Sequence, residues 1–230
     1  MQITPEIYMV DGVKGAHVYI ILDNGITLVD TGMGGSQKPI LKAINELGYG
    51  PSDIKRIIIT HAHIDHILGL KALCDVSKAE VVAAEADVGT IEGKKPLYFP
   101  KMEFPNNLLL LLLRPFIKYT PTTVDRQLKD GDTLPILGGL TVLGLPGHSP
   151  GNIGLYCPAK KLLFSSDTLR IKGGEFAKPL NYAVEREKSL ASIRKIGSLD
   201  YDIMLPGFGD PILSGASKKV AAYVQKLEKE

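Results

Sequence analysis

Residues 60–66 of this chain, Thr-His-Ala-His-Ile-Asp-His, hold three histidines and one aspartate directly after the apolar run 57–59. A fourth histidine, His148, stands in a second loop, 145–151, and only His17 lies outside these two segments. Neutral imidazole and carboxylate groups are ligands that suit zinc, iron and related divalent metals. The types and spacing of these residues therefore predict a metal site.

The residues alone leave the sharing of ligands between metals open. The groups in question are His61, His63, Asp65, His66, His148 and Asp167. One metal can take His61 and His63, and a second can take Asp65 and His66. His148 and Asp167 come from another part of the chain. A set of buried structural histidines is the alternative, but such residues seldom gather in strand-terminal loops without a metal.

Composition and charge restrict the classes of function. Of 230 residues 44% are hydrophobic, and 27 Lys plus Arg nearly balance 25 Asp plus Glu, so no basic field favours nucleic acid. Cys74 and Cys157 are far apart, which predicts no disulfide framework and fits a reducing compartment. Residues 1–6 do not resemble a signal peptide, and the longest apolar run, 108–113, is too short for a membrane span. We therefore expect a cytoplasmic protein.

The elements that must position the histidines are predicted to be mixed α/β. Apolar patterning predicts strands at 16–22 and 26–29 around an Asp-Asn-Gly turn, a helix at 36–47, and a strand at 56–60. These form a hairpin followed by a β-α-β unit whose last strand ends in the histidines. The carboxyl ends of such strands are where open α/β sheets usually bind ligands.

The second half of the chain repeats the first hairpin. Residues 153–168 run strand, turn, strand and Asp-Thr, as residues 18–31 do, which indicates two halves of related plan. The pattern further predicts a helix at 184–196, a short strand at 203–205 and a closing helix at 216–230.

A segment of different character, about 93–124, separates the two halves and holds five prolines around the six leucines 108–113. A helix of successive leucines is apolar on every side and must be buried against the body, a second subunit or an apolar ligand. We expect one domain, 1–230, in which this segment is a lid-like insertion. A homodimer contact through the same leucines is the alternative.

The order of these motifs resembles the metallo-β-lactamase-fold hydrolase superfamily, in its glyoxalase II-like branch. The resemblance rests on Asp30-Thr31-Gly32, residues 60–66, Gly147-His148 and Asp167, and it extends over most of the chain. It implies an α/β fold of αββα four-layer sandwich type, with a metal site at one edge of the two sheets.

The resemblance also implies roles for single residues. The first metal would be bound by His61, His63 and His148, the second by Asp65 and His66, and Asp167 would bridge the two. Asp30 matches a family position that orients ligands from behind the site without binding metal.

The chain departs from the family in the loop before its last helix. The family offers a histidine there, whereas residues 205–210 read Leu-Pro-Gly-Phe-Gly-Asp, and Phe208 cannot coordinate a metal. We therefore expect one firm zinc site and a second site that is weak or absent, which Asp210 would complete only if the loop bends unusually. Iron and manganese are the alternative metals.

The resemblance implies a metal-dependent hydrolase of a small acyl substrate. We expect hydroxide on the metal to attack an ester, thioester or lactone carbonyl, because a divalent metal lowers the pKa of water to near ~7 and polarises the acyl oxygen. Asp65 would move the proton to the leaving group. Phe208, Tyr182 and Leu110 are candidates for an apolar substrate pocket.

Two other functions are compatible with the same fold. A mononuclear iron sulfur dioxygenase would use His61, His148 and Asp167 as its metal ligands. A non-catalytic scaffold would explain Phe208 as decay of the site, although six of seven expected ligand positions are intact.

Overall fold

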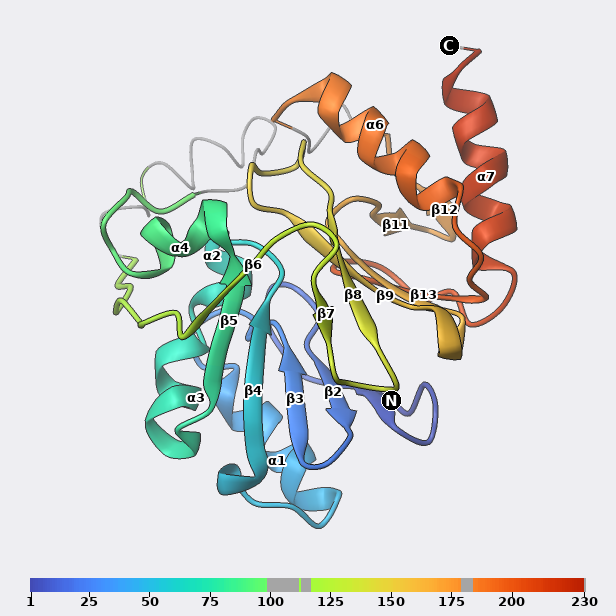
Figure 1. Cartoon of the computed structure of the whole chain (residues 1–230). Helices are drawn as coiled ribbons and strands as arrows, with labels where there is room; N and C mark the ends of the chain where they lie inside the picture. Colours follow the sequence, from blue (N-terminus) through green and yellow to red (C-terminus); the bar gives the residue numbers. More distant parts are fainter. Residues whose placement is uncertain (99–111, 113–116, 179–183, 230) are drawn as a thin grey trace.

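A computed structural model describes residues 1–98, 112, 117–178 and 184–229. It contains two packed sheets with helices on their outer faces (Figure 1). The first sheet runs in chain order: β1 (Ile7–Met9), β2 (Tyr19–Leu22), β3 (Ile26–Val29), β4 (Ile54–Ile59), β5 (Glu80–Ala84) and β6 (Arg126–Leu128). The second has the order β13 (Ile203–Pro206), β10 (Leu162–Ser166), β9 (Ile153–Cys157), β8 (Leu140–Gly144) and β7 (Thr133–Leu134).

The remaining elements cover or connect these sheets. The helices are α1 (Gln37–Glu46), α2 (Ile64–Ile67), α3 (Leu70–Ser77), α4 (Glu85–Ile91), α6 (Arg186–Gly197) and α7 (Ala216–Leu227). Two 3-10 turns, Pro51–Asp53 and Pro158–Lys160, precede strands, and β11 (Ile171–Lys172) pairs with β12 (Glu175–Phe176) in a small ribbon.

Side chains that alternate along the strands divide the apolar residues into separate cores. In β4, Ile58 faces the core between the two sheets, whereas Ile57 and Ile59 belong to the core under α1 and α3. On the far side, Leu163 of β10 lies in a third core with residues of α6 and α7, such as Ile193. Three apolar layers between four structural layers confirm the expected αββα sandwich.

Several predicted elements have the expected bounds. The strand predicted at 26–29 is found unchanged as β3, the strand predicted to begin at residue 153 is β9, and each belongs to an antiparallel hairpin. Each hairpin is followed by a parallel partner, β4 beside β3 and β13 beside β10. This shared plan brings the carboxyl ends of strands from both halves to the same edge of the molecule.

The prediction of a strand from residue 16 was wrong at its start, because β2 begins only at Tyr19. The backbone N–H of Ala16 donates to the carbonyl of Asp65 at 3.1 Å, and the N–H of His17 donates to the carbonyl of Gly207 at 2.9 Å. These residues therefore connect two loops of the site instead of extending the sheet.

Some predictions fall outside the described residues. Leu110, Tyr182 and most of the leucine run 108–113 belong to this part of the chain. The lid, the homodimer contact and the pocket roles of Leu110 and Tyr182 therefore stay predictions. Among the described helices, none is both long and apolar enough to cross a membrane.

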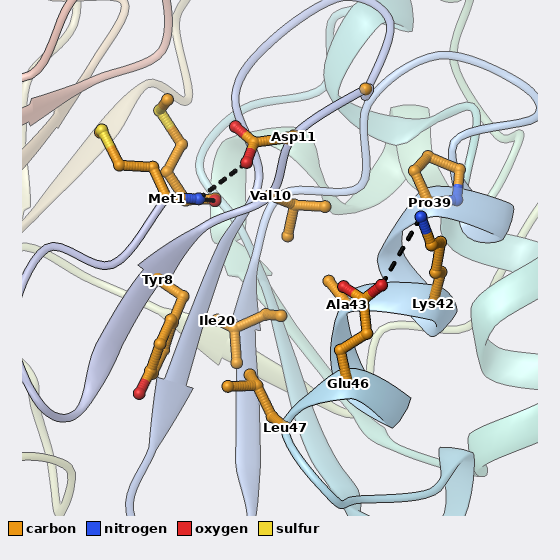
Figure 2. A pocket seen from close by; sticks show the side chains of 12 residues that line it. Met1, Tyr8, Val10, Asp11, Ile20, Pro39, Lys42, Ala43, Glu46 and Leu47 are labelled. Atoms are coloured by element: carbon orange, nitrogen blue, oxygen red, sulfur yellow. Dashed lines mark hydrogen bonds and ion pairs between the residues drawn. The ribbon is translucent and has the colours of Figure 1, made fainter.

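A pocket of about 430 Å³ lies between β1, β2 and α1 (Figure 2). Two ion pairs stand at its wall, Lys42 with Glu46 at 3.5 Å and the Met1 amino group with Asp11 at 2.9 Å. None of its lining residues belongs to the histidine clusters. The pocket is therefore separate from the site described below.

Candidate metal centre

The histidine-rich segment leaves the end of β4 and enters α2, which lies beyond the carboxyl ends of β4 and β5 in Figure 1. His63 is the N-cap of α2, so the helix begins inside the motif and carries Asp65 and His66. The carbonyl of Thr60 accepts a 2.9 Å hydrogen bond from the N–H of Ile153, the first residue of β9. This bond holds the loops of the two sheets together at the site.

Three imidazoles converge at this edge. The Nδ1 atom of His63 lies 2.9 Å from Nε2 of His61 and 2.9 Å from Nε2 of His148. All three rings are at most 2% exposed. Burial and the neighbouring histidines lower the pKa of His63 to about 2 and that of His61 well below its ordinary value. Three imidazoles whose nitrogens point at one another are the donor set that one divalent metal requires.

Asp167 follows β10 and stands against this cluster. Its Oδ2 atom lies 3.2 Å from Nε2 of His148, and its Oδ1 atom lies 3.6 Å from Nε2 of His66. Complete burial alone would raise the pKa of Asp167, but Arg170, His148 and His66 hold it well below its ordinary value. The carboxylate is therefore ionised and faces both groups of predicted ligands.

A second potential set of metal ligands consists of His61, His66 and Asp167. Nε2 of His66 and Oδ1 of Asp167 are buried and have no hydrogen-bond partner among the described residues. Unpartnered buried polar atoms are costly, and a bound cation is one way to satisfy them. The set of His61, His63 and His148 offers three converging nitrogens, whereas the second set offers two nitrogens and one carboxylate oxygen, with His66 and Asp167 3.6 Å apart.

Asp30 supports both sets from the end of β3. Its Oδ1 accepts a 2.8 Å bond from the N–H of Thr60, and its Oδ2 accepts a 2.7 Å bond from the Thr60 hydroxyl and lies 2.9 Å from Nδ1 of His66. Burial would lower the pKa of His66, but Asp30 and Asp167 raise it well above its ordinary value. Asp30 therefore fixes the ring of His66 and the backbone before His61.

Asp65, the predicted proton carrier and metal ligand, lies in α2 but belongs to neither of the two ligand sets that the described residues form. Within the described part of the chain its buried Oδ1 atom has no hydrogen-bond partner, while the residue as a whole is half-buried. A carboxylate oxygen left unpaired in this way is available to a proton or a cation.

Asp87 in α4 is a site residue that sequence reasoning missed. Its Oδ2 accepts a 2.8 Å hydrogen bond from the N–H of Ala62, the residue between the first two histidines. Burial raises the pKa of Asp87 to about 6, against the opposing effect of that bond and of Lys95. The only sequence signal was an acidic residue in the first turn of a helix, which is ordinary.

A hydroxyl and amide network behind the site was also missed. The Ser166 hydroxyl donates to Oγ1 of Thr60 at 2.9 Å and lies 2.9 Å from Oδ1 of Asn152. The Asn152 amide in turn donates to Oγ1 of Thr168 at 3.0 Å. His17, the histidine outside the motifs, has Nε2 2.9 Å from the carbonyl of Gly209 and so holds the loop that carries Phe208.

Phe208 stands close to the second set of ligands. Its ring centroid lies 6.0 Å from that of His66, at 69° between the ring planes. Cζ of Arg170 lies 4.4 Å from the centre of the Phe208 ring, and the Arg170 guanidinium donates to Oδ2 of Asp167. Sequence reasoning identified the unusual phenylalanine but missed the arginine.

The profile of the Metallo-beta-lactamase superfamily matches residues 11–207. The chain belongs to this superfamily. YobT, an uncharacterized protein of Bacillus subtilis, is 25% identical over 217 residues, which cover 90% of this chain and 88% of YobT. A hydroxyacylglutathione hydrolase of Cereibacter sphaeroides is 25% identical over 205 residues, covering 87% of this chain and 64% of the relative, so less than two-thirds of that enzyme is matched.

Solved structures agree with this membership. BJP-1, a subclass B3 metallo-β-lactamase of Bradyrhizobium japonicum, superposes with a TM-score of 0.71 and is 28% identical, covering 100% of this chain and 90% of BJP-1. The predicted superfamily and fold are therefore confirmed. This metallo-β-lactamase superfamily protein is hydrolase-like, and its histidine and aspartate cluster is able to bind metal.

Proposed function

We propose that this superfamily member is a hydrolase that uses one divalent metal, zinc in the first instance, to cleave a thioester, ester or lactone. The observation that carries the proposal is the convergence of His61, His63 and His148, whose facing nitrogens lie 2.9 Å apart in two pairs. His63 lies against both other rings, which favours a three-histidine site over a facial triad of His61, His148 and Asp167.

When bound, a divalent metal polarises an acyl oxygen and makes water more acidic. The residues of the chain transfer the proton and hold the ligands in position. Asp65 takes up the proton at its unpaired Oδ1 and delivers it to the leaving group. Asp30 keeps His66 and the backbone before His61 in place through its three hydrogen-bond contacts. Phe208 lies beside His66, and Arg170 holds the Asp167 carboxylate.

The class of bond is supported by the relatives. Hydroxyacylglutathione hydrolases act on a thioester by name, and a relative of this class matches along 87% of this chain. The near-neutral net charge of +2 gives no general attraction for polyanions. We further propose that the chain forms one domain, because the core between the sheets includes Ile58 from the first half and Phe164 from the second.

Metal analysis combined with a substrate panel tests this function. The protein, purified without added metal, is assayed for zinc, iron and manganese, and then for hydrolysis of an S-acylglutathione, an aryl ester and a lactone. We expect about one zinc per chain, hydrolysis of at least one substrate, and loss of both in His148→Ala. One iron per chain with oxygen uptake would favour the dioxygenase, and a folded protein that binds no metal would favour the scaffold.

A further inference from the structure

Arg170 forms an ion pair with the aspartate that the superfamily pattern uses as a bridge. Nε of Arg170 lies 3.2 Å from Oδ2 of Asp167, and the Nη2 group donates to the same oxygen. Asp167 is completely buried, whereas the Arg170 side chain is 22% exposed. A guanidinium group stays protonated throughout the pH range of proteins. The carboxylate that would bridge two metals therefore already has a permanent cation bound to one oxygen.

Phe208 stacks on the same guanidinium. The 4.4 Å between Cζ of Arg170 and the centre of the ring is a cation–π distance. The N–H of Ile171, next to the arginine, donates to the carbonyl of Phe208 at 3.2 Å, so the backbones of the two loops are joined beside the stacked pair. A histidine at this position is what the superfamily pattern expects. The phenylalanine thus removes a metal ligand and also provides a surface for Arg170.

The backbone packs tightly on the other oxygen of the carboxylate. A Cβ atom at Gly207 would lie 2.2 Å from Oδ1 of Asp167 and 3.4 Å from Cε1 of His66. Only glycine fits there, which brings the peptide before Phe208 directly against the second set of ligands. A dication at that set would share His61 with the first set and would meet a close backbone and the positive charge of Arg170.

We propose that the Arg170 guanidinium, stacked on Phe208, takes the place of the second metal. Its ion pair with Asp167 would then limit the site to a single metal. The inference rests on the proposed function and goes beyond it. The missing histidine alone would leave a second site that is weak, whereas a resident cation on Asp167 opposes a second dication by charge. Replacing Phe208 with histidine is therefore not sufficient to restore a two-metal site.

Titration with Co²⁺ tests this inference. Wild type, Phe208→His, Arg170→Gln and the double variant Arg170→Gln/Phe208→His are each incubated with tenfold excess Co²⁺, desalted and analysed for metal per chain. The matched control is Arg56→Gln, because Arg56 is a similarly half-buried arginine, 21% exposed and paired with Glu80 at 2.7 Å away from the site. Cobalt d–d absorption reports how the bound ions are coordinated.

We expect about one Co²⁺ in wild type, Arg56→Gln and Phe208→His, and about two in the double variant. Two ions in wild type, or two in Phe208→His held as tightly as in the double variant, would overturn the inference. If the double variant fails to fold, Arg170→Gln alone decides. It should bind a second Co²⁺ at least roughly tenfold more tightly than Arg56→Gln does, and equal binding would contradict the role of Arg170.

The same proteins separate this inference from the proposed function. A wild type that holds one ion but hydrolyses none of the panel would contradict the function and support the single-metal site. A wild type that hydrolyses the panel with two ions bound would support the function and overturn the role of Arg170.

Discussion

Nδ1 of His66 lies 2.9 Å from Oδ2 of Asp30, and the two residues are 36 positions apart in the chain. Asp30 has a positive φ of 63° at the end of β3, an uncommon conformation for a residue other than glycine. This backbone conformation places the Asp30 carboxylate within hydrogen-bond distance of both Thr60 and His66. A strained residue held by several hydrogen bonds is typical of a position selected for its site.

Asp30→Ala should therefore damage both stability and metal binding. It leaves the buried N–H of Thr60 without its partner, which costs on the order of 1–3 kcal/mol of unfolding free energy. Loss of the contact that orients a ligand lowers metal affinity or activity roughly 10–100-fold. Urea denaturation and metal titration measure the two effects.

The control for this prediction is Asp200→Asn, because Asp200 is 77% exposed and its carboxylate pairs with Lys161 at 3.2 Å. It should change the unfolding free energy by less than about 0.5 kcal/mol. An Asp30→Ala protein with the metal affinity of Asp200→Asn would show that Asp30 does not support the site.

Gly151→Ala should destabilise the protein through Asp87. A Cβ atom at Gly151 would lie 2.2 Å from Cγ of Asp87, the residue that binds the N–H of Ala62. Overpacking of this kind costs typically about 1–3 kcal/mol, and here it displaces the backbone between His61 and His63. Gly34→Ala is the control, since no described residue lies within 4 Å of a Cβ atom added there and its φ is not positive. Equal urea midpoints for the two variants would contradict the prediction.

The parts of the site that are local in sequence were predictable. Residues 60–66 form one turn, so their chemistry and spacing could be read directly, and the repeated hairpins located Asp30 and Asp167 at strand ends. The periodicity of apolar residues also located α1 and α6 to within about two residues of their bounds.

The parts that depend on the folded chain were not predictable. Asp87 meets Ala62 across 25 positions, and Arg170 meets Phe208 only because β11 lies beside the loop that follows β13. Neither contact has a periodic signal. Strand β5 was also missed, because it is buried along most of its length and lacks the alternation of a half-exposed strand.

The Cys74 thiol should react slowly with alkylating reagents at neutral pH. Burial, with smaller effects from Asp125 and Asp75, raises the pKa of its thiol to about 11. At pH 8 only about one thiol in a thousand is then ionised, so alkylation by iodoacetamide should speed up nearly tenfold per pH unit up to about pH 10.

Peptide mass spectrometry after timed alkylation follows Cys74 and Cys157 separately. Cys157 is completely buried and its thiol donates to the carbonyl of Leu137 at 3.4 Å, so it should remain unmodified until the protein unfolds. Protein in urea gives the rate of the accessible thiols. Rapid modification of Cys74 at pH 7 in the folded protein would contradict the raised pKa.

Removal of the metal should lower the thermal stability of the wild type. Three imidazoles converge in the folded chain, and the unfolded chain has no such set, so a metal binds the folded state preferentially. At a free metal concentration of 1,000 times Kd this preference contributes about 4 kcal/mol. A chelator should reduce Tm, and added zinc should restore it. His148→Ala lacks one of the three ligands, so its Tm should respond far less to chelator. A wild-type Tm unaffected by chelator would contradict the prediction that these histidines bind a metal.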